Sequence, residues 1–283
     1  MADIQGRTGR FIRALIADRR IRVLAVVADG PADVLRVNHE LDAVASQLAA
    51  EGLVSNVLLS AYIKGDERIL LEIGGSQPHF AFSGEARSDG MVRGRFSPEK
   101  MASVDHLKGQ LIAIKWGAKK ELYRGLAEVD HPNLEGALQA YLTKSQQSPG
   151  LVRLAATTRE DGSVDFAAGL LVEMIPETME PEEFEALAKE LKRAPLRETM
   201  TQFAFGQLLG EELEILEARD LVFKCRCSRE RVEGALRALG PEEIQSLIED
   251  PGFAEVTCHF CNSSYRLEPV ELKALIASSS APN

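Results

Sequence analysis

The amino-acid sequence predicts an α+β protein in three parts: an N-terminal mixed α/β core with a largely antiparallel sheet, a helical linker, and a small C-terminal domain organised by cysteines. Strand patterns joined by tight turns dominate the first part, amphipathic helical patterns follow, and all four cysteines occur in the last quarter of the chain. Strands interleaved with few helices favour an antiparallel sheet. We place the domains at 1–176, 177–220 and 221–283.

Two hairpins are the clearest local predictions in the N-terminal core. Asp161-Gly162 separates the strand patterns 151–159 and 164–175, and apolar residues alternate along the second pattern. Ser88-Asp89-Gly90 separates 80–87 from 91–96 in the same way. Glycine adopts the positive φ that tight hairpin turns need, so Asp-Gly between alternating apolar residues is typical of a β-hairpin.

Apolar periodicity predicts the other elements of the core. Alternation over 68–73, and the apolar segments 111–116 and 121–129, indicate strands. Helical spacing between 34 and 48 and over 133–145 indicates helices.

The segment 177–220 is strongly acidic and still carries apolar stripes. It holds twelve acidic and five basic residues, within a chain whose net charge is −10. Pro181 and Pro195 suit first helical turns. We expect two or three amphipathic helices that need another surface to cover them, because short helices are marginal alone. The stripes comprise Phe184, Leu187 and Leu191, then Leu196, Met200 and Phe203, with Leu208, Leu209, Leu213 and Leu216 beyond.

The C-terminal part predicts short elements around the cysteines. We expect a strand from 221 into Cys225, a helix over 228–239, and a helix that begins at Pro241 and is broken by Pro251-Gly252. Two strand-like segments, 255–261 and 265–267, follow, and the tail 278–283 is expected to fray.

The four cysteines form two closely spaced pairs that predict a zinc site. The pattern is Cys225-x-Cys227, then 30 intervening residues, then Cys258-x-x-Cys261. Two pairs brought together by a fold offer four thiolates, which is the tetrahedral donor set of structural Zn²⁺. We therefore expect one Zn²⁺ per chain. His259 lies inside the second pair and is expected at the surface, since four sulfurs already complete a tetrahedron.

The spacing alone leaves open whether such a zinc site is purely structural or a redox switch. A small region buries little core, so a zinc-site folding energy of roughly 10–16 kcal/mol would hold it folded. Thiolates at zinc remain oxidisable to disulfides. Lys224 and Arg226 are expected to lower the pKa of the adjacent thiols.

Two other classes of function fit parts of the pattern. A nucleic-acid-binding zinc ribbon is disfavoured because seven basic residues in 221–283 are outnumbered by nine acidic ones. A thiol–disulfide oxidoreductase would use Cys258-x-x-Cys261, but such enzymes place this motif at a helix N-terminus. The scattered histidines suggest no Ser/His/Asp or Cys/His arrangement, so we do not expect an enzyme.

The N-terminal sequence and the hydropathy predict a cytoplasmic protein that does not enter membranes. The first residues are polar and charged, and no apolar signal-peptide region follows them. The apolar runs 23–28 and 169–172 are much shorter than the about 20 residues that span a bilayer.

The cysteine block closely resembles the heat-shock protein 33 family of redox-regulated chaperones. The resemblance lies in FKCRCSRERV at 223–232, CHFCN at 258–262 and Tyr265, with LGEEL at 209–213 similar to that family's linker. LLSAYIKGDER at 58–68, EAR at 85–87, VRG at 92–94, Tyr141-Leu142 with Ser145 and Gln147, and GLL at 169–171 extend it over nearly the whole chain.

The resemblance implies an ATP-independent holdase that is inactive while reduced and bound to zinc. Oxidants such as peroxide or hypochlorous acid, with unfolding conditions, release zinc in that family and form two disulfides. Carried over, these are Cys225–Cys227 and Cys258–Cys261. The linker then loses order, apolar surface binds unfolding client proteins, and active members form dimers.

Overall fold

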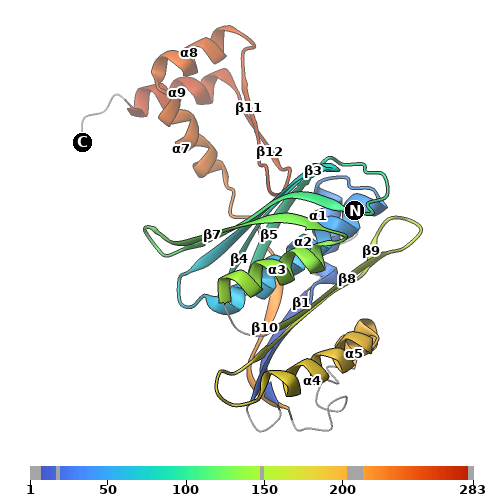
Figure 1. Ribbon diagram of the computed structural model, residues 1–283. Coiled ribbons are helices and arrows are strands. Elements are labelled where there is room, and N and C mark those ends of the chain that lie inside the picture. Colours follow the sequence, from blue (N-terminus) through green and yellow to red (C-terminus); the bar gives the residue numbers. More distant parts are fainter. Residues whose placement is uncertain (1–7, 17–19, 147–149, 203–212, 280–283) are drawn as a thin grey trace. The chain divides into compact units, whose positions relative to one another are not determined.

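The chain folds into two compact units, Met1–Lys224 and Cys225–Asn283, which we call the N-terminal and C-terminal units. The computed structural model describes residues 8–16, 20–146, 150–202 and 213–279. Figure 1 shows the elements.

The strands of the N-terminal unit are β1 (Gly9–Ile16), β2 (Ile21–Val27), β3 (Arg68–Gln77), β4 (His79–Arg87), β5 (Met91–Ser97), β6 (Leu107–Trp116), β7 (Glu121–His131), β8 (Gly150–Thr158), β9 (Val164–Met174) and β10 (Glu214–Phe223). Its helices are α1 (Asp29–Asn38), α2 (Ala43–Leu59), the 3-10 turn η2 (Ser60–Tyr62), α3 (Leu134–Gln146), α4 (Pro181–Arg193) and α5 (Leu196–Gln202).

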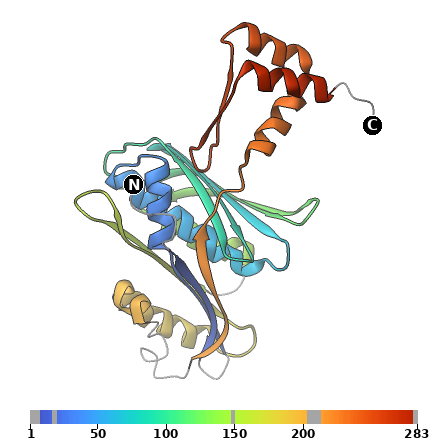
Figure 2. The ribbon, with the colours of Figure 1, turned by 180° about the vertical axis from the view of Figure 1, so that it is seen from behind.

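The strands of the N-terminal unit form one ten-stranded sheet in the order β7-β6-β3-β4-β5-β10-β1-β2-β9-β8. Neighbouring strands pair antiparallel, as predicted, except at one point. There β10 pairs with β5 in parallel, through Val222 and Phe223 opposite Met91 and Val92. Strand β10 thus joins the two halves of the sheet, and it runs beside β1 in Figure 2.

Helices cover the sheet on two faces because its central strands are apolar on both sides. Along β9, Leu171 joins the core beneath α1, α2 and α3, whereas Leu170 and Val172 join a second core beneath α4 and α5. Figure 1 shows α4 and α5 on the opposite side of these strands from α2 and α3. The second core confirms that the stripe of Phe184, Leu187 and Leu191 is covered by another surface.

Helix α2 packs unusually close to the sheet. A Cβ atom added at Gly52 would lie 2.8 Å from the ring of Phe82, and one at Gly169 of β9 would lie 2.5 Å from Val54. The segment Ala43–Tyr62 is long and apolar enough to cross a membrane by length and composition, which the survey of apolar runs overlooked. In the fold, 78% of its most apolar window is buried, as expected of a core helix.

Both predicted hairpins are present. Strands β8 and β9 are joined by the Asp161-Gly162 turn, where Gly162 has a φ of 79° and Ser163 donates its backbone N–H to Asp161 Oδ1. Strands β4 and β5 are joined through Gly90, with a φ of 86°. These turns formed as expected because their geometry is set by the local residues.

The linker prediction is wrong at its C-terminal end. Residues Glu214–Phe223 form β10 and not a helix, so Leu216 lies on a strand, where it is exposed. Leu221, expected to open the C-terminal domain, is buried in the N-terminal core. The segment 177–220 therefore forms no third unit, and the chain divides at Lys224 and not at Asp220. Phe203, Leu208 and Leu209 lie outside the described residues.

The C-terminal unit is small. It contains α7 (Arg229–Leu239), α8 (Pro241–Glu249), the hairpin of β11 (Ala254–Thr257) and β12 (Ser264–Leu267), and α9 (Pro269–Ser279). Helix α9 was not predicted and occupies part of the tail expected to fray. The apolar core of this unit consists of Val232, Leu236, Ile244, Ala254, Leu267, Leu272 and Leu275.

Candidate metal centre

Local structure places the two cysteine pairs at the ends of regular elements. Cys225 and Cys227 lie just before α7, whose first turn is capped by the side chain of Ser228, which accepts a hydrogen bond from the N–H of Arg231. Cys258 and Cys261 lie in the turn between β11 and β12. That turn is closed by two backbone hydrogen bonds, from Cys258 N–H to Ser263 O (2.9 Å) and from Asn262 N–H to Cys258 O (2.8 Å).

The fold of the C-terminal unit brings all four sulfurs together. They lie within 4.8 Å of one another, and each cysteine is half-buried. Two short contacts join the two motifs: 3.5 Å between the sulfurs of Cys225 and Cys258, and 3.3 Å between those of Cys227 and Cys261. Four sulfurs at about 2.3 Å from a tetrahedral Zn²⁺ would lie about 3.8 Å apart. The donor set therefore fits a tetrahedral metal ion.

Burial and hydrogen bonds shift the pKa values of the thiols in different directions. Burial raises the pKa of Cys225 to about 12 and also raises that of Cys227. The expected lowering of these two pKa values by Lys224 and Arg226 is wrong, because burial dominates. Burial also raises the pKa of Cys261, but hydrogen bonds from Ser263 and the neighbouring thiols outweigh it and bring this pKa to about 7. A bound cation would favour the thiolate form of all four.

Two hydroxyl groups contact the sulfurs: the sequence analysis named Tyr265 only as part of the family resemblance, and it did not single out Ser263. Tyr265 donates its hydroxyl hydrogen to Cys227 Sγ at 3.1 Å, and Ser263 Oγ lies 3.3 Å from Cys261 Sγ. Both residues follow the second cysteine pair within four positions, and Tyr265 also belongs to the block that carries the family resemblance. His259 is exposed, as expected, and does not belong to the sulfur cluster.

The arrangement of Cys258 and Cys261 differs from that of a thiol–disulfide oxidoreductase. Their turn connects two strands, whereas the motif of such an enzyme begins a helix whose dipole lowers the thiol pKa. The oxidoreductase alternative therefore lacks its expected structural setting.

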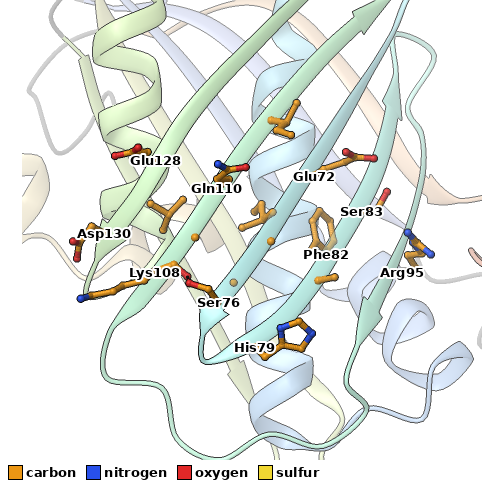
Figure 3. Close-up of a pocket in the computed structure, with 17 residues that line it drawn as sticks. Glu72, Ser76, His79, Phe82, Ser83, Arg95, Lys108, Gln110, Glu128 and Asp130 are labelled. Atoms are coloured by element: carbon orange, nitrogen blue, oxygen red, sulfur yellow. Dashed lines mark hydrogen bonds between the residues drawn. The ribbon is translucent and has the colours of Figure 1, made fainter.

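A concave site also lies on the N-terminal sheet, and its lining combines acidic, basic and apolar side chains. A hollow of about 740 Å³ lies over β3 to β7. Gly74, Gly75 and Gly109 line it and have no side chains to fill it. Figure 3 shows its polar rim, made of acidic, basic and neutral side chains. Among the described residues, its lining forms no hydrogen-bonded nucleophile and base. The labelled residues are Glu72, Ser76, His79, Phe82, Ser83, Arg95, Lys108, Gln110, Glu128 and Asp130.

Comparisons with known proteins agree over almost the whole chain. The family model described as Hsp33 protein matches residues 9–268. A 33 kDa chaperonin from Symbiobacterium thermophilum is 31% identical over 281 residues, which cover 93% of this chain and 95% of that protein. The 33 kDa chaperonin of Bacillus subtilis is 27% identical, with 94% and 97% covered.

The fold is also that of a solved relative. The crystal structure of the 33 kDa chaperonin (heat shock protein 33 homolog) from Thermotoga maritima superposes with a TM-score of 0.83 at 22% identity, covering 96% of this chain and 98% of that one.

An α+β unit followed by a small unit with four clustered cysteines defines a class of two-unit proteins with a candidate metal site. Within that class the chain belongs to the Hsp33 family, which is a family of chaperones.

Proposed function

We propose that this chaperone is a redox-regulated, ATP-independent holdase whose metal centre keeps it inactive while reduced. The supporting observation is the cluster of four half-buried sulfurs within 4.8 Å in a unit with a small apolar core. The ligands are Cys225, Cys227, Cys258 and Cys261, and the metal is one Zn²⁺ per chain, because Zn²⁺ prefers four thiolates in tetrahedral geometry. Bound zinc supplies the cross-link that holds the C-terminal unit folded.

Oxidation is the switch in this proposal. Peroxide or hypochlorous acid converts the thiolates into disulfides, and the C-terminal unit releases zinc and unfolds. The family resemblance implies the pairs Cys225–Cys227 and Cys258–Cys261. Sulfur contacts of 3.5 Å and 3.3 Å also join Cys225 to Cys258 and Cys227 to Cys261, across the two motifs. Peptide mapping of the oxidised protein distinguishes the two pairings.

The client-binding surface in this proposal is the apolar core under α4 and α5. Strand β10 ends at Phe223, two residues before Cys225, so in this proposal the unfolding of the C-terminal unit reaches the end of β10. Release of the linker helices exposes the sheet face that contains Phe166, Leu170 and Val172. Apolar surface of this kind binds unfolding proteins.

The proposal also covers catalysis, oligomeric state, location and partners. A holdase binds clients stoichiometrically, so the protein is not an enzyme in this proposal, and it forms a homodimer when oxidised. It acts in the cytoplasm, where thiols stay reduced until stress oxidises them. It binds neither nucleic acid nor membranes, and the acidic net charge of −10 keeps the opened state soluble.

One paired measurement tests the proposal. Reduced protein is expected to contain one zinc per chain and to leave aggregation of a thermally unfolded client unchanged. Peroxide with mild heat is expected to release the zinc and start the suppression of aggregation with the same time course. Equal suppression by fully reduced, zinc-loaded protein would contradict the switch.

A further inference from the structure

The two hydroxyl groups beside the sulfurs are distributed one to each cysteine motif. Tyr265 donates its hydroxyl hydrogen to Cys227 Sγ at 3.1 Å, and Ser263 Oγ accepts from the Cys261 thiol at 3.3 Å, a contact in which the hydroxyl donates once Cys261 is a thiolate. Within the described part of the chain, Cys225 and Cys258 have no corresponding hydroxyl contact. Each motif therefore holds one sulfur next to a hydroxyl group and one sulfur without such a neighbour.

The hairpin of the C-terminal unit fixes both hydroxyl groups. Tyr265 lies on β12 opposite Val256 of β11, and its ring packs against the small apolar core. The backbone oxygen of Ser263 accepts the N–H of Cys258, which fixes Ser263 within the turn. The hydroxyls are thus held by packing and backbone bonds that do not depend on the sulfurs they touch.

A hydrogen bond donated to a thiolate stabilises its negative charge and makes the sulfur a weaker nucleophile. Groups that contact metal ligands in this way tune the ligands without binding the metal. The same bond opposes attack on an oxidant, because the charge that it stabilises is lost as the sulfur–oxygen bond forms.

We propose that Tyr265 and Ser263 are positioning residues that set how fast the metal centre is oxidised, with Tyr265 as the main brake through Cys227. This inference rests on the proposed redox switch. The thiolate of Cys227 attacks peroxide, so that a sulfur–oxygen bond forms, the oxygen–oxygen bond breaks and hydroxide leaves. The thiolate of Cys225 then attacks the Cys227 sulfur, a disulfide forms and a second hydroxide leaves. Two protons from solvent complete two waters, and the two sulfurs lose the two electrons that peroxide gains.

The test uses the full-length, zinc-loaded chain and compares two variants with a matched control. Tyr265→Phe keeps the ring and removes the hydroxyl, and Ser263→Ala removes the other. Thr257→Val is the control, because it removes a 2.9 Å hydrogen bond to Ser264 in the same hairpin that touches no sulfur. Zinc release by peroxide is followed with a chromogenic chelator.

Tyr265→Phe is expected to release zinc about three- to ten-fold faster than the unmodified protein, which is the effect expected if about half of the free energy of a hydrogen bond to a charged group is lost in the transition state. Ser263→Ala is expected to have a smaller effect of the same sign, and Thr257→Val none. Thermal unfolding and zinc affinity of Tyr265→Phe should stay close to those of the unmodified chain. The thiolate-to-metal absorption of the Co²⁺-loaded form should shift in Tyr265→Phe but not in Thr257→Val.

An unchanged rate in Tyr265→Phe overturns the proposal, as does equal acceleration by Thr257→Val, which would mean that the hairpin merely loosened. If Tyr265→Phe fails to fold, Ser263→Ala is compared with Thr257→Val instead. Zinc release that is no faster in Ser263→Ala than in the control then overturns the proposal. Alkylation of Cys227 by iodoacetamide in the zinc-loaded chain gives a readout without oxidant. If peroxide releases no zinc from the unmodified protein, the proposed function fails, while faster alkylation in Tyr265→Phe still supports the brake.

Discussion

Glu51 is a carboxyl group that the fold keeps largely away from water, which disfavours its charged form. It lies on α2 beside a cavity of about 290 Å³ lined by the start of α3 and the segment before β6. Burial raises the pKa of Glu51 to about 7, a hydrogen bond with Gln47 opposes this rise, and the negative charge of Glu135 adds to it. The folded chain therefore binds a proton at Glu51 more tightly than the unfolded chain does.

This difference predicts how stability depends on pH. Between about pH 4.5 and pH 7 the folded state holds more protons at Glu51, so the free energy of unfolding falls as the pH rises. Glu51→Gln removes this cost, and we expect the variant to be more stable by about 1–3 kcal/mol at pH 8 and nearly unchanged near pH 4.5. Urea unfolding, followed by the fluorescence of Trp116, the single tryptophan, measures the free energy of unfolding at both pH values. Glu128→Gln on the exposed face of β7 is the control, and an equal gain there would contradict the assignment.

Among the elements, α4 and α5 are attached by a modest apolar face and by polar contacts at their ends. Phe184 and Leu191 are buried on α4, while Arg153 donates a hydrogen bond to the backbone oxygen of Leu191 at 2.6 Å. On α5, Arg197 bonds Asp165 and lies 4.5 Å from the ring of Phe166. In the proposed switch, these contacts are the ones that must break for α4 and α5 to leave the sheet.

Loosening α4 should therefore mimic oxidation. Leu191→Ala deletes a buried side chain and is expected to cost about 2–4 kcal/mol of helix docking. We expect the reduced, zinc-loaded variant to bind a hydrophobic dye and to suppress client aggregation, which the unmodified reduced protein should not do. Glu185→Ala, on the exposed side of the same helix, should behave like the unmodified protein. Activity in both variants, or in neither, would argue against α4 as the cover of the client surface.

At the scale of the whole molecule, the two units differ in what holds them folded. The N-terminal unit buries extensive apolar cores on both sides of its sheet, whereas the core of the C-terminal unit is formed by seven buried side chains. Such a small core leaves little stability against the conformational entropy of the chain. A metal centre with a folding energy of about 10–16 kcal/mol would then decide whether the C-terminal unit is folded.

Removal of the metal should consequently unfold the C-terminal unit and leave the N-terminal unit folded. Chelation of zinc under reducing conditions is expected to abolish the amide protection of Cys225–Asn283 while Trp116 fluorescence and the protection of β3, β4 and β6 persist. Hydrogen exchange with and without zinc measures the amide protection of both units in one experiment, and Trp116 fluorescence is recorded alongside. A C-terminal unit that stays equally protected without metal would mean that its apolar core suffices.

Features with local causes were predictable from the sequence. The Asp161-Gly162 hairpin, the stripe of Phe184 and Leu191, and the two cysteine pairs each depend on residues close in the chain, because turn geometry, helical periodicity and ligand spacing are set by neighbours. Strand β10 was missed because its acidic sequence resembles the preceding helices. Its strand conformation depends on pairing with β1, about two hundred residues earlier in sequence, which local propensity cannot reveal.

By itself, the sequence determined the chemistry of this protein: four thiols in two pairs can bind a soft metal and can be oxidised, whatever surrounds them. Only the tertiary structure decided which groups contact those sulfurs. It placed the hydroxyls of Tyr265 and Ser263 on the sulfurs, and it inserted β10 between β1 and β5 directly before the first cysteine. The reason is physical: residue type fixes what a side chain can do, and packing between distant segments fixes what it touches.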